Sequence, residues 1–332
     1  MKTSTRILAR TRSTRPQSMV ARVRRYLKIK RSLGFEMEST GLMLMHFARF
    51  ADRRRQTGPL KSEWILAWAT SNSSHSQRYQ AGRLSAVRCF ARHCAAEDAR
   101  SEVPAARLLP APQVRKQPHI FSDGEIKGLL GAARHLHPVY PLRPTVYATL
   151  LGLLACTGMR ISEALGLTLA DVDLSAGVLT VRRTKFRKSR LVPLHPTSTA
   201  ALDAYIRERD PHGDMPRSRP LLIGGNSQSL PYTTVLHTFR RIVRQLGYRS
   251  NGTMHVVRIH DLRHSFACRR LLEWYRHGVN VEHAIASLST YLGHGKVTDT
   301  YWYLTGTGEL LATVAKRFEQ FAGKATSEGR PT

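Results

Sequence analysis

The sequence predicts a mainly helical protein with two domains and one small antiparallel β-sheet. Three observations support this. The chain has 332 residues, a length that suits about two domains. Apolar residues recur at helical spacing along most of it. Only residues 178–183 and 190–194 are rich in β-formers, and the basic stretch 184–189 between them is typical of a hairpin tip.

The charge balance indicates a polyanionic partner. Lys and Arg number 52 against 23 Asp and Glu, which leaves a net charge of +29. Such a surplus favours nucleic acid, and we expect double-stranded DNA rather than a membrane. The longest uncharged apolar run, residues 146–159, is shorter than the roughly 18 residues that a spanning helix needs.

The cysteines predict a reduced, intracellular protein. Cys89, Cys94, Cys156 and Cys268 form no CxxC pair and no Cys/His array with zinc spacing. The basic N-terminus is not followed by the apolar run of a signal peptide. We therefore expect a cytoplasmic protein, nucleoid-associated when bound to DNA, with no metal and no cofactor.

The first predicted domain, residues 18–103, is a helical DNA-binding module. Helical spacing runs from residue 20 to residue 51, with a break at Gly34, and two more helices are expected at 61–70 and 77–95. Trp64 and Trp68, spaced i and i+4, are expected in its core; stacking on DNA bases is the alternative.

Three segments lie outside the predicted domains. Residues 1–17 carry five basic residues and no acid, so they form a flexible arm that follows a phosphate backbone or has no role. Residues 104–118 contain four prolines and are predicted to be a linker. Residues 323–332 are predicted to be a disordered tail.

The second predicted domain, residues 119–322, is of the α+β class. Ser122 and Glu125 fit a capping box, which starts a helix that reaches about residue 134. A turn is expected at residues 171–173. Further helices are predicted at 145–156, 234–246, 262–276 and 308–321. The last has an apolar face that docks either on a neighbouring protomer or on its own domain.

Chemistry-bearing residues gather near the C-terminus. His260, Arg263, His294 and two tyrosines, Tyr301 and Tyr303, fall within forty-four residues. A tyrosine hydroxyl has a pKa near 10, so as a nucleophile it needs a proton acceptor or nearby positive charge. Histidine titrates near neutrality and suits the first need, and arginine suits the second. His264 lies nearby and is expected to be structural.

Four motifs in order carry a resemblance to a known family. They are Thr-Gly-Met-Arg-Ile-Ser-Glu at 157–163, Arg-Leu-Val-Pro-Leu at 190–194, His-Asp-Leu-Arg-His-Ser-Phe-Ala at 260–267, and Leu-Gly-His at 292–294 followed by Tyr303. The chain resembles the tyrosine recombinase (phage integrase) family from about residue 119 to residue 322. Residues 18–103 resemble its core-binding domain more loosely.

The resemblance implies a role for each site residue. Arg160 and Arg263 would clamp a phosphate as electrostatic stabilisers, a task that suits the planar guanidinium. In the family the nucleophile stands nine residues after the histidine of Leu-Gly-His, which selects Tyr303 over Tyr301. His260 would be the general base toward Tyr303, and His294 would bind a phosphate oxygen.

Two further residues take roles by resemblance. Lys185, five residues before Arg190, would protonate the leaving 5′-oxygen, with Lys188 as its competitor. Glu163 would be accessory, orienting Arg160 or His260; a plain surface acid is the alternative.

The resemblance implies a site-specific DNA recombinase, an integrase or transposase, that forms a 3′-phosphotyrosyl intermediate at Tyr303 without metal or ATP. A homo-tetramer on two DNA sites, or assembly with partner recombinases, is expected. A type IB topoisomerase-like enzyme, a regulatory DNA-binding subunit and a basic ribosome-associated protein are the alternatives.

The chain departs from the commonest family pattern in two places. The 34 residues from His260 to His294 exceed what a compact chromosome-resolving recombinase would have, and Leu304-Thr305 replaces the usual threonine-histidine. The Tyr-Trp-Tyr-Leu context at 301–304 is similar to transposon-encoded recombinases, including those that act in sets. The departures bear on the biological role more than on the chemistry.

Overall fold

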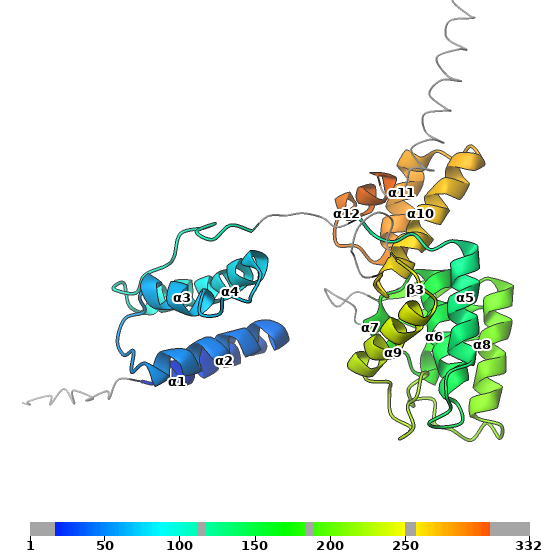
Figure 1. Cartoon of the computed structure of the whole chain (residues 1–332), viewed down its shortest axis with the longest axis horizontal. Coiled ribbons are helices and arrows are strands. Elements are labelled where there is room, and N and C mark those ends of the chain that lie inside the picture. Colours follow the sequence, from blue (N-terminus) through cyan, green and yellow to red (C-terminus); the bar gives the residue numbers. More distant parts are fainter. Residues whose placement is uncertain (1–16, 112–116, 183–188, 250–256, 306–332) are drawn as a thin grey trace, which may run out of the picture. The chain divides into compact units, whose positions relative to one another are not determined.

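The computed structural model describes residues 17–111, 117–182, 189–249 and 257–305, and the chain divides into two compact units, Met1–Arg115 and Lys116–Thr332 (Figure 1). The described residues are mainly helical, with one three-stranded antiparallel sheet in the second unit. The predicted fold class is therefore confirmed. Nearly all of the predicted arm, the predicted helix 308–321 and the tail lie outside the described residues.

The described part of the first unit, residues 17–111, contains four helices around one apolar core. They are α1 (Met19–Ser32), α2 (Glu38–Arg53), α3 (Ser62–Ala69) and α4 (Gln77–Glu97). Phe47 and Phe90 are fully buried. Trp68 packs edge-on against Phe47, with ring centroids 5.5 Å apart, and Trp64 lies at the margin of the same core. The expectation that these tryptophans belong to the core is confirmed.

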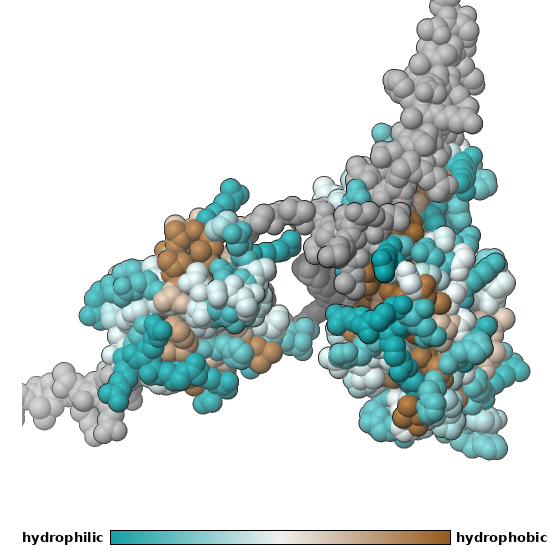
Figure 2. Space-filling model, viewed as in Figure 1, coloured by the Kyte–Doolittle hydropathy of each residue, from teal (hydrophilic) through white to brown (hydrophobic). Residues whose placement is uncertain are grey.

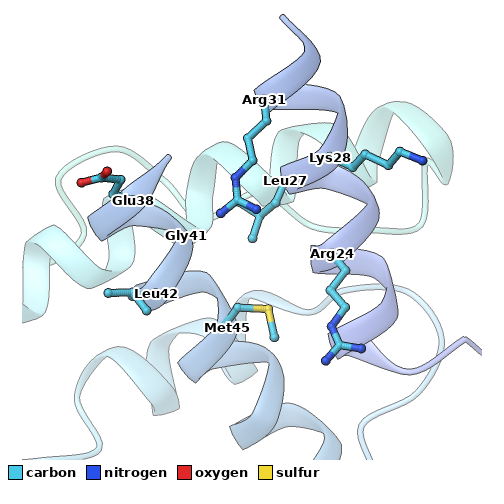
Figure 3. Close-up of a pocket in the computed structure, with 8 residues that line it drawn as sticks. All are labelled: Arg24, Leu27, Lys28, Arg31, Glu38, Gly41, Leu42 and Met45. Atoms are coloured by element: carbon cyan, nitrogen blue, oxygen red, sulfur yellow. The ribbon is translucent and has the colours of Figure 1, made fainter. Parts of the chain in front are cut away.

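A groove runs between α1 and α2 (Figure 3). Leu27 of α1 and Met45 of α2 line it together with Gly41. Arg24 and Lys28 stand along the α1 side. The visible surface of this unit is largely hydrophilic, with smaller apolar patches (Figure 2). The groove thus has an apolar floor and a basic wall.

The second unit is built around helix α6. Its helices are α5 (Asp123–Arg134), α6 (Arg143–Thr157), α7 (Ile161–Leu165), α8 (Pro196–Arg209), α9 (Tyr232–Gln245), α10 (Asp261–Arg276), α11 (Val281–Leu292) and α12 (Thr298–Tyr301), with 3₁₀ turns η1 (Leu169–Asp171) and η2 (Trp302–Thr305). Helix α6 packs against α5, α8 and α10, and it is apolar and buried over most of its length (Figure 1). Because it is covered on several sides, it shows no single apolar stripe.

The sheet has the order β1-β2-β3, from β1 (Val172–Asp173), β2 (Val178–Val181) and β3 (Arg190–Pro193). The predicted hairpin is β2–β3, and its tip, residues 183–188, lies outside the described residues. The turn predicted at 171–173 is wrong, because Val172 pairs with Leu179 in the sheet and is buried. The change of direction comes later and includes Gly177, which has a positive φ of 63°. Strand pairing here overrides the local turn preference of two aspartates.

The start of the second unit is attached to α10. Phe121 donates its backbone N–H to Ser265 Oγ at 2.8 Å, and its carbonyl accepts from Arg269 Nη2 at 2.6 Å. These bonds hold the helix that carries Arg263 against the beginning of α5. In the parts of the chain that the structure describes, no helix is long and apolar enough to cross a membrane.

The capping box of α5 yields a stability prediction. Ser122 Oγ accepts from Glu125 N at 3.2 Å, and Glu125 Oε2 accepts from Ser122 N at 2.8 Å, as the sequence predicted. We expect Ser122→Ala to lower the free energy of unfolding by about 1 kcal/mol, because the Glu125 N–H at the start of the helix loses its hydrogen-bond partner. Urea titration followed by circular dichroism measures this. Ser287→Ala, at an exposed position within α11, is the control and should change it by less than about 0.5 kcal/mol; equal losses would contradict the cap.

Candidate active site

A glycine at the end of α6 sets the position of Arg160. Gly158 adopts a left-handed conformation with φ 61°. A Cβ there would lie 2.5 Å from Cδ1 of Phe266 on α10, so only glycine permits this approach of the two helices. The chain turns at this residue, and Arg160 follows as the residue before α7.

Glu163 is a buried carboxylate that joins two arginines. It accepts from Arg160 Nη1 at 2.8 Å and from the Arg160 backbone N–H at 2.9 Å. Arg190 of β3 donates Nη1 and Nη2 to its two oxygens at 3.1 and 2.7 Å. Burial would raise the pKa of Glu163, but these hydrogen bonds outweigh it and hold the pKa below its usual value. Glu163 is therefore an ionised bridge between guanidinium groups and not a surface acid.

The C-terminal end of α11 accepts hydrogen bonds from three arginines. Arg190 Nε donates to Tyr291 O at 2.7 Å, and Arg263 Nη2 donates to Leu292 O at 2.6 Å. Arg160 Nη2 donates to Gly293 O at 2.9 Å. The last carbonyls of a helix lack partners within the helix and carry a partial negative charge. Three guanidinium groups from distant segments therefore converge on three consecutive carbonyls.

Arg263 is the most buried of these arginines. Its side chain also donates Nη1 to Gly158 O at 2.9 Å, and the residue is 2% exposed. Burial lowers the pKa of Arg263 to about 10, a shift that Tyr303 opposes. The guanidinium is therefore still charged at neutral pH. It is a fixed positive charge in a site from which water is largely excluded.

The three histidines of the site are neutral at pH 7. Burial is the main cause and nearby arginines add to it: the pKa falls to about 4 for His260, to about 3 for His264 and to about 4 for His294. The His264 ring packs edge-on against His260, with centroids 5.0 Å apart, and also contacts Tyr303 at 5.4 Å. His294 stacks on Tyr303 at 6.0 Å, and its Nδ1 lies 2.7 Å from Thr300 Oγ1.

The two competing tyrosines lie in different environments. Tyr303 is 3% exposed, and its hydroxyl lies close enough to the Arg263 guanidinium for that group to act on its pKa. Burial raises the pKa of Tyr303, and the charge of Arg263 partly offsets this. Tyr301 is 46% exposed. Of the two, Tyr303 is the one that lies among the arginines and histidines.

The structure brings together all but one of the residues singled out from the sequence. Arg160, Glu163 and Arg263 are linked by hydrogen bonds to one another or to the end of α11, and the Tyr303 hydroxyl lies close to Arg263. His260 and His294 lie close enough to the arginines for their charge to lower the pKa of both rings. Lys185 and its competitor Lys188 fall on the hairpin tip, outside the described residues.

Sequence reasoning missed two features of the site. It did not single out Arg190, although strand alternation puts this residue on the same side as the buried Val192. A charged side chain on the inward face of a strand needs a partner of opposite charge or a hydrogen-bond acceptor, so the position of Arg190 could have been used to predict a buried ion pair. It expected His264 to be structural but did not foresee that its ring packs against both His260 and Tyr303. Among the described residues, no three His, Cys, Asp or Glu side chains are grouped as a metal site would require.

The neutral histidines predict a pH dependence of stability. Between the ordinary pKa of 6.5 and the folded value of about 3, the unfolded chain binds a proton at His264 that the folded chain does not. The free energy of unfolding should therefore decrease as the pH falls through this range. His264→Asn should make that decrease smaller, as measured by urea titrations over a pH series. The exposed His283→Asn should keep the wild-type slope; an unchanged slope in His264→Asn would contradict a neutral, buried His264.

Comparison with known proteins agrees with this geometry. The Phage integrase family matches residues 123–308. The chain is 40% identical to y4rB of Sinorhizobium fredii, named as an integrase/recombinase, over 90% of this chain and 96% of y4rB. It is 31% identical to the tyrosine recombinase XerD of Xanthomonas axonopodis over 72% and 74% of the two chains. The solved Tn1549 transposon integrase shares the fold, with a TM-score of 0.62, 19% identity and coverage of 91% of this chain and 99% of that one. The chain therefore belongs to the phage integrase family of tyrosine recombinases, and it is a site-specific recombinase that breaks and rejoins DNA.

Proposed function

We propose that this recombinase cuts each DNA strand through a 3′-phosphotyrosyl bond to Tyr303. The observation that carries this is the placement of two arginines and one tyrosine hydroxyl in a single cluster, in which Arg263 and Tyr303 are buried and Arg160 is partly exposed. Arg160 and Arg263 are both held on the end of α11, and the Tyr303 hydroxyl lies close to Arg263. A phosphate at the arginines would therefore lie next to the nucleophile.

The arginines would stabilise the charge that grows on the phosphate in the transition state. A guanidinium has five N–H donors, and the bonds to carbonyls and to Glu163 occupy two of those of Arg160. The remaining donors are free of these bonds and suit the non-bridging oxygens. Because the protein already fixes each fork, little reorganisation is needed when the phosphate arrives.

The proton and electron movements of cleavage follow from this arrangement. The Tyr303 oxygen attacks phosphorus and loses its proton, while the bond between phosphorus and the 5′-oxygen breaks. A neutral histidine accepts the proton; His260 is the proposed base, and its low pKa keeps it unprotonated. Lys185 is proposed to protonate the leaving 5′-oxygen. The phosphotyrosyl bond conserves the phosphoester energy, so rejoining by a 5′-hydroxyl requires no ATP.

Access to the site requires a movement of the chain. Arg263 and Tyr303 are 2% and 3% exposed. A DNA phosphate can reach them only after part of the chain has moved. We propose that DNA binding makes this opening, so that the histidines and Tyr303 meet the phosphate in an assembled complex.

DNA binding is proposed to involve both domains. The wall of the α1–α2 groove presents Arg24, Lys28 and Arg31 (Figure 3), and the whole chain carries +29. The solved Tn1549 integrase is bound to transposon right end DNA. By analogy we propose that residues 18–103 and 119–322 both bind duplex DNA, that 104–118 links them, and that protomers act as a tetramer or with partner recombinases at the ends of a mobile element.

The nucleophile assignment is tested by covalent capture. The wild-type protein is first incubated with a library of nicked duplexes of random sequence. The duplexes that stay attached through a denaturing wash are recovered, and they serve as the substrate. Tyr303→Phe should form no adduct on denaturing gels, because it lacks the attacking oxygen, while Tyr301→Phe should keep the adduct. The reverse pattern would assign the nucleophile to Tyr301. Failure of the wild type to capture any duplex would favour a non-catalytic DNA-binding protein.

The electrostatic contribution of the first domain is tested by salt dependence. The logarithm of the DNA association constant should fall steeply and linearly with the logarithm of the salt concentration, because bound cations are released. Lys28→Gln should reduce that slope by about 1 if Lys28 contacts a phosphate. Fluorescence anisotropy with a labelled duplex measures it. Arg100→Gln, whose guanidinium pairs with Asp98, is the control; equal slope losses would mean that Lys28 acts only through bulk charge.

A further inference from the structure

We infer that Arg190 is a positioning residue for DNA cleavage, which keeps Arg160 available to the phosphate by sharing the charge of Glu163. The inference rests on the proposed function. Arg190 begins the Arg-Leu-Val-Pro-Leu motif, lies outside the two motifs that hold Arg160 and Arg263, and is not proposed to touch DNA. It acts through its contacts with Glu163 and with the end of α11.

Arg190 forms a fork on the carboxylate of Glu163. Its two terminal nitrogens take one oxygen each, at 3.1 and 2.7 Å, and its Nε binds Tyr291 O at 2.7 Å. Its side chain is 11% exposed, against 25% for Arg160. The N–H groups of Arg190 are therefore hydrogen-bonded inside the protein, whereas the side chain of Arg160 remains accessible to solvent.

The charges explain why a second arginine is needed. Glu163 fixes Arg160 in place, but one carboxylate facing one guanidinium would cancel its charge. With Arg190 added, the group of Arg160, Glu163 and Arg190 keeps one net positive charge. Arg160 thus gains a rigid support and still presents a positive charge to a phosphate. In a buried site, where screening is weak, this difference is large.

The backbone at Gly293 leaves little space between the end of α11 and the two guanidinium groups of Arg160 and Arg190. Gly293 has φ 68°, and a Cβ there would lie 2.9 Å from Arg190 Nη1 and 3.5 Å from Arg160 Nη1. Both guanidinium groups therefore rest against the same residue at the end of α11. A lysine at position 190 would supply charge but not the fork, since it is a single point donor.

The experiment measures single-turnover adduct formation on the duplex captured by the wild type. Arg190→Gln should slow the reaction at least about tenfold, as expected when one stabilising contact is weakened. Arg190→Lys should fall between Arg190→Gln and wild type. DNA affinity, measured for each change in a Tyr303→Phe background, should stay within about threefold, because Arg190 contacts no phosphate.

Two readouts separate positioning from a structural role. The first is the double variant with Glu163→Gln and Arg190→Gln. It lacks the carboxylate charge that would offset the positive charge of Arg160, so it should react faster than Arg190→Gln alone. The second replaces a charged oxygen of the scissile phosphate by a methyl group. On this neutral methylphosphonate the rate ratio of wild type to Arg190→Gln should approach one. All rates are taken where circular dichroism shows each variant folded, and Arg190→Lys takes the place of Arg190→Gln if the latter unfolds.

The outcomes are distinct. If the wild type forms an adduct and Arg190→Gln matches its rate, the inference is wrong while the proposed function stands. A rate defect that is the same on phosphate and methylphosphonate would assign Arg190 a purely structural role and likewise overturn the inference. If the wild type forms no adduct with any duplex, the proposed function itself fails, and the inference fails with it.

Discussion

The interaction on which the site depends is the convergence of three arginines on the last carbonyls of α11. Arg160, Arg190 and Arg263 come from three separate segments, and each occupies one of three consecutive carbonyls. The end of a helix offers unpaired acceptors and a partial negative charge, so it helps to hold these cations, and Glu163 is the one carboxylate that Arg160 and Arg190 share. Each guanidinium is thereby fixed while its overall charge is kept. A site for a polyanion needs this combination.

Burial lowers the pKa of the histidines around these arginines and raises the pKa of the tyrosine, so both kinds of group stay uncharged. It keeps His260, His264 and His294 neutral, because a buried imidazolium beside arginines is costly. It also keeps Tyr303 protonated, although Arg263 works against this. Among the described residues of the resting site, the positive charge is therefore carried by arginine. The histidines are neutral and can accept a proton, whereas the Tyr303 hydroxyl still carries its proton.

Much of the fold was predictable because it follows from residue patterns that are local in the sequence. The capping box of Ser122 and Glu125, the hairpin β2–β3 and the helices of the first unit all follow from short-range spacing. Helices α8 and α11 were not predicted, and the strand β1 was mistaken for a turn. Val172 forms a strand because Leu179 pairs with it, which is a partnership that no local preference reveals.

The sequence by itself determined which residue types the site contains and the order in which they occur: Arg160 and Glu163, then His260 and Arg263, then His294 and Tyr303. Their motifs are local, so a single sequence suffices to find them. Only the tertiary structure decided that Arg190 completes the group, that His264 contacts Tyr303, and that Tyr303 rather than Tyr301 is buried among the arginines. Those facts depend on which side chains meet the end of α11 and the face of α10. Such contacts join residues that lie from tens to more than a hundred positions apart, and spacing along the chain carries no record of them.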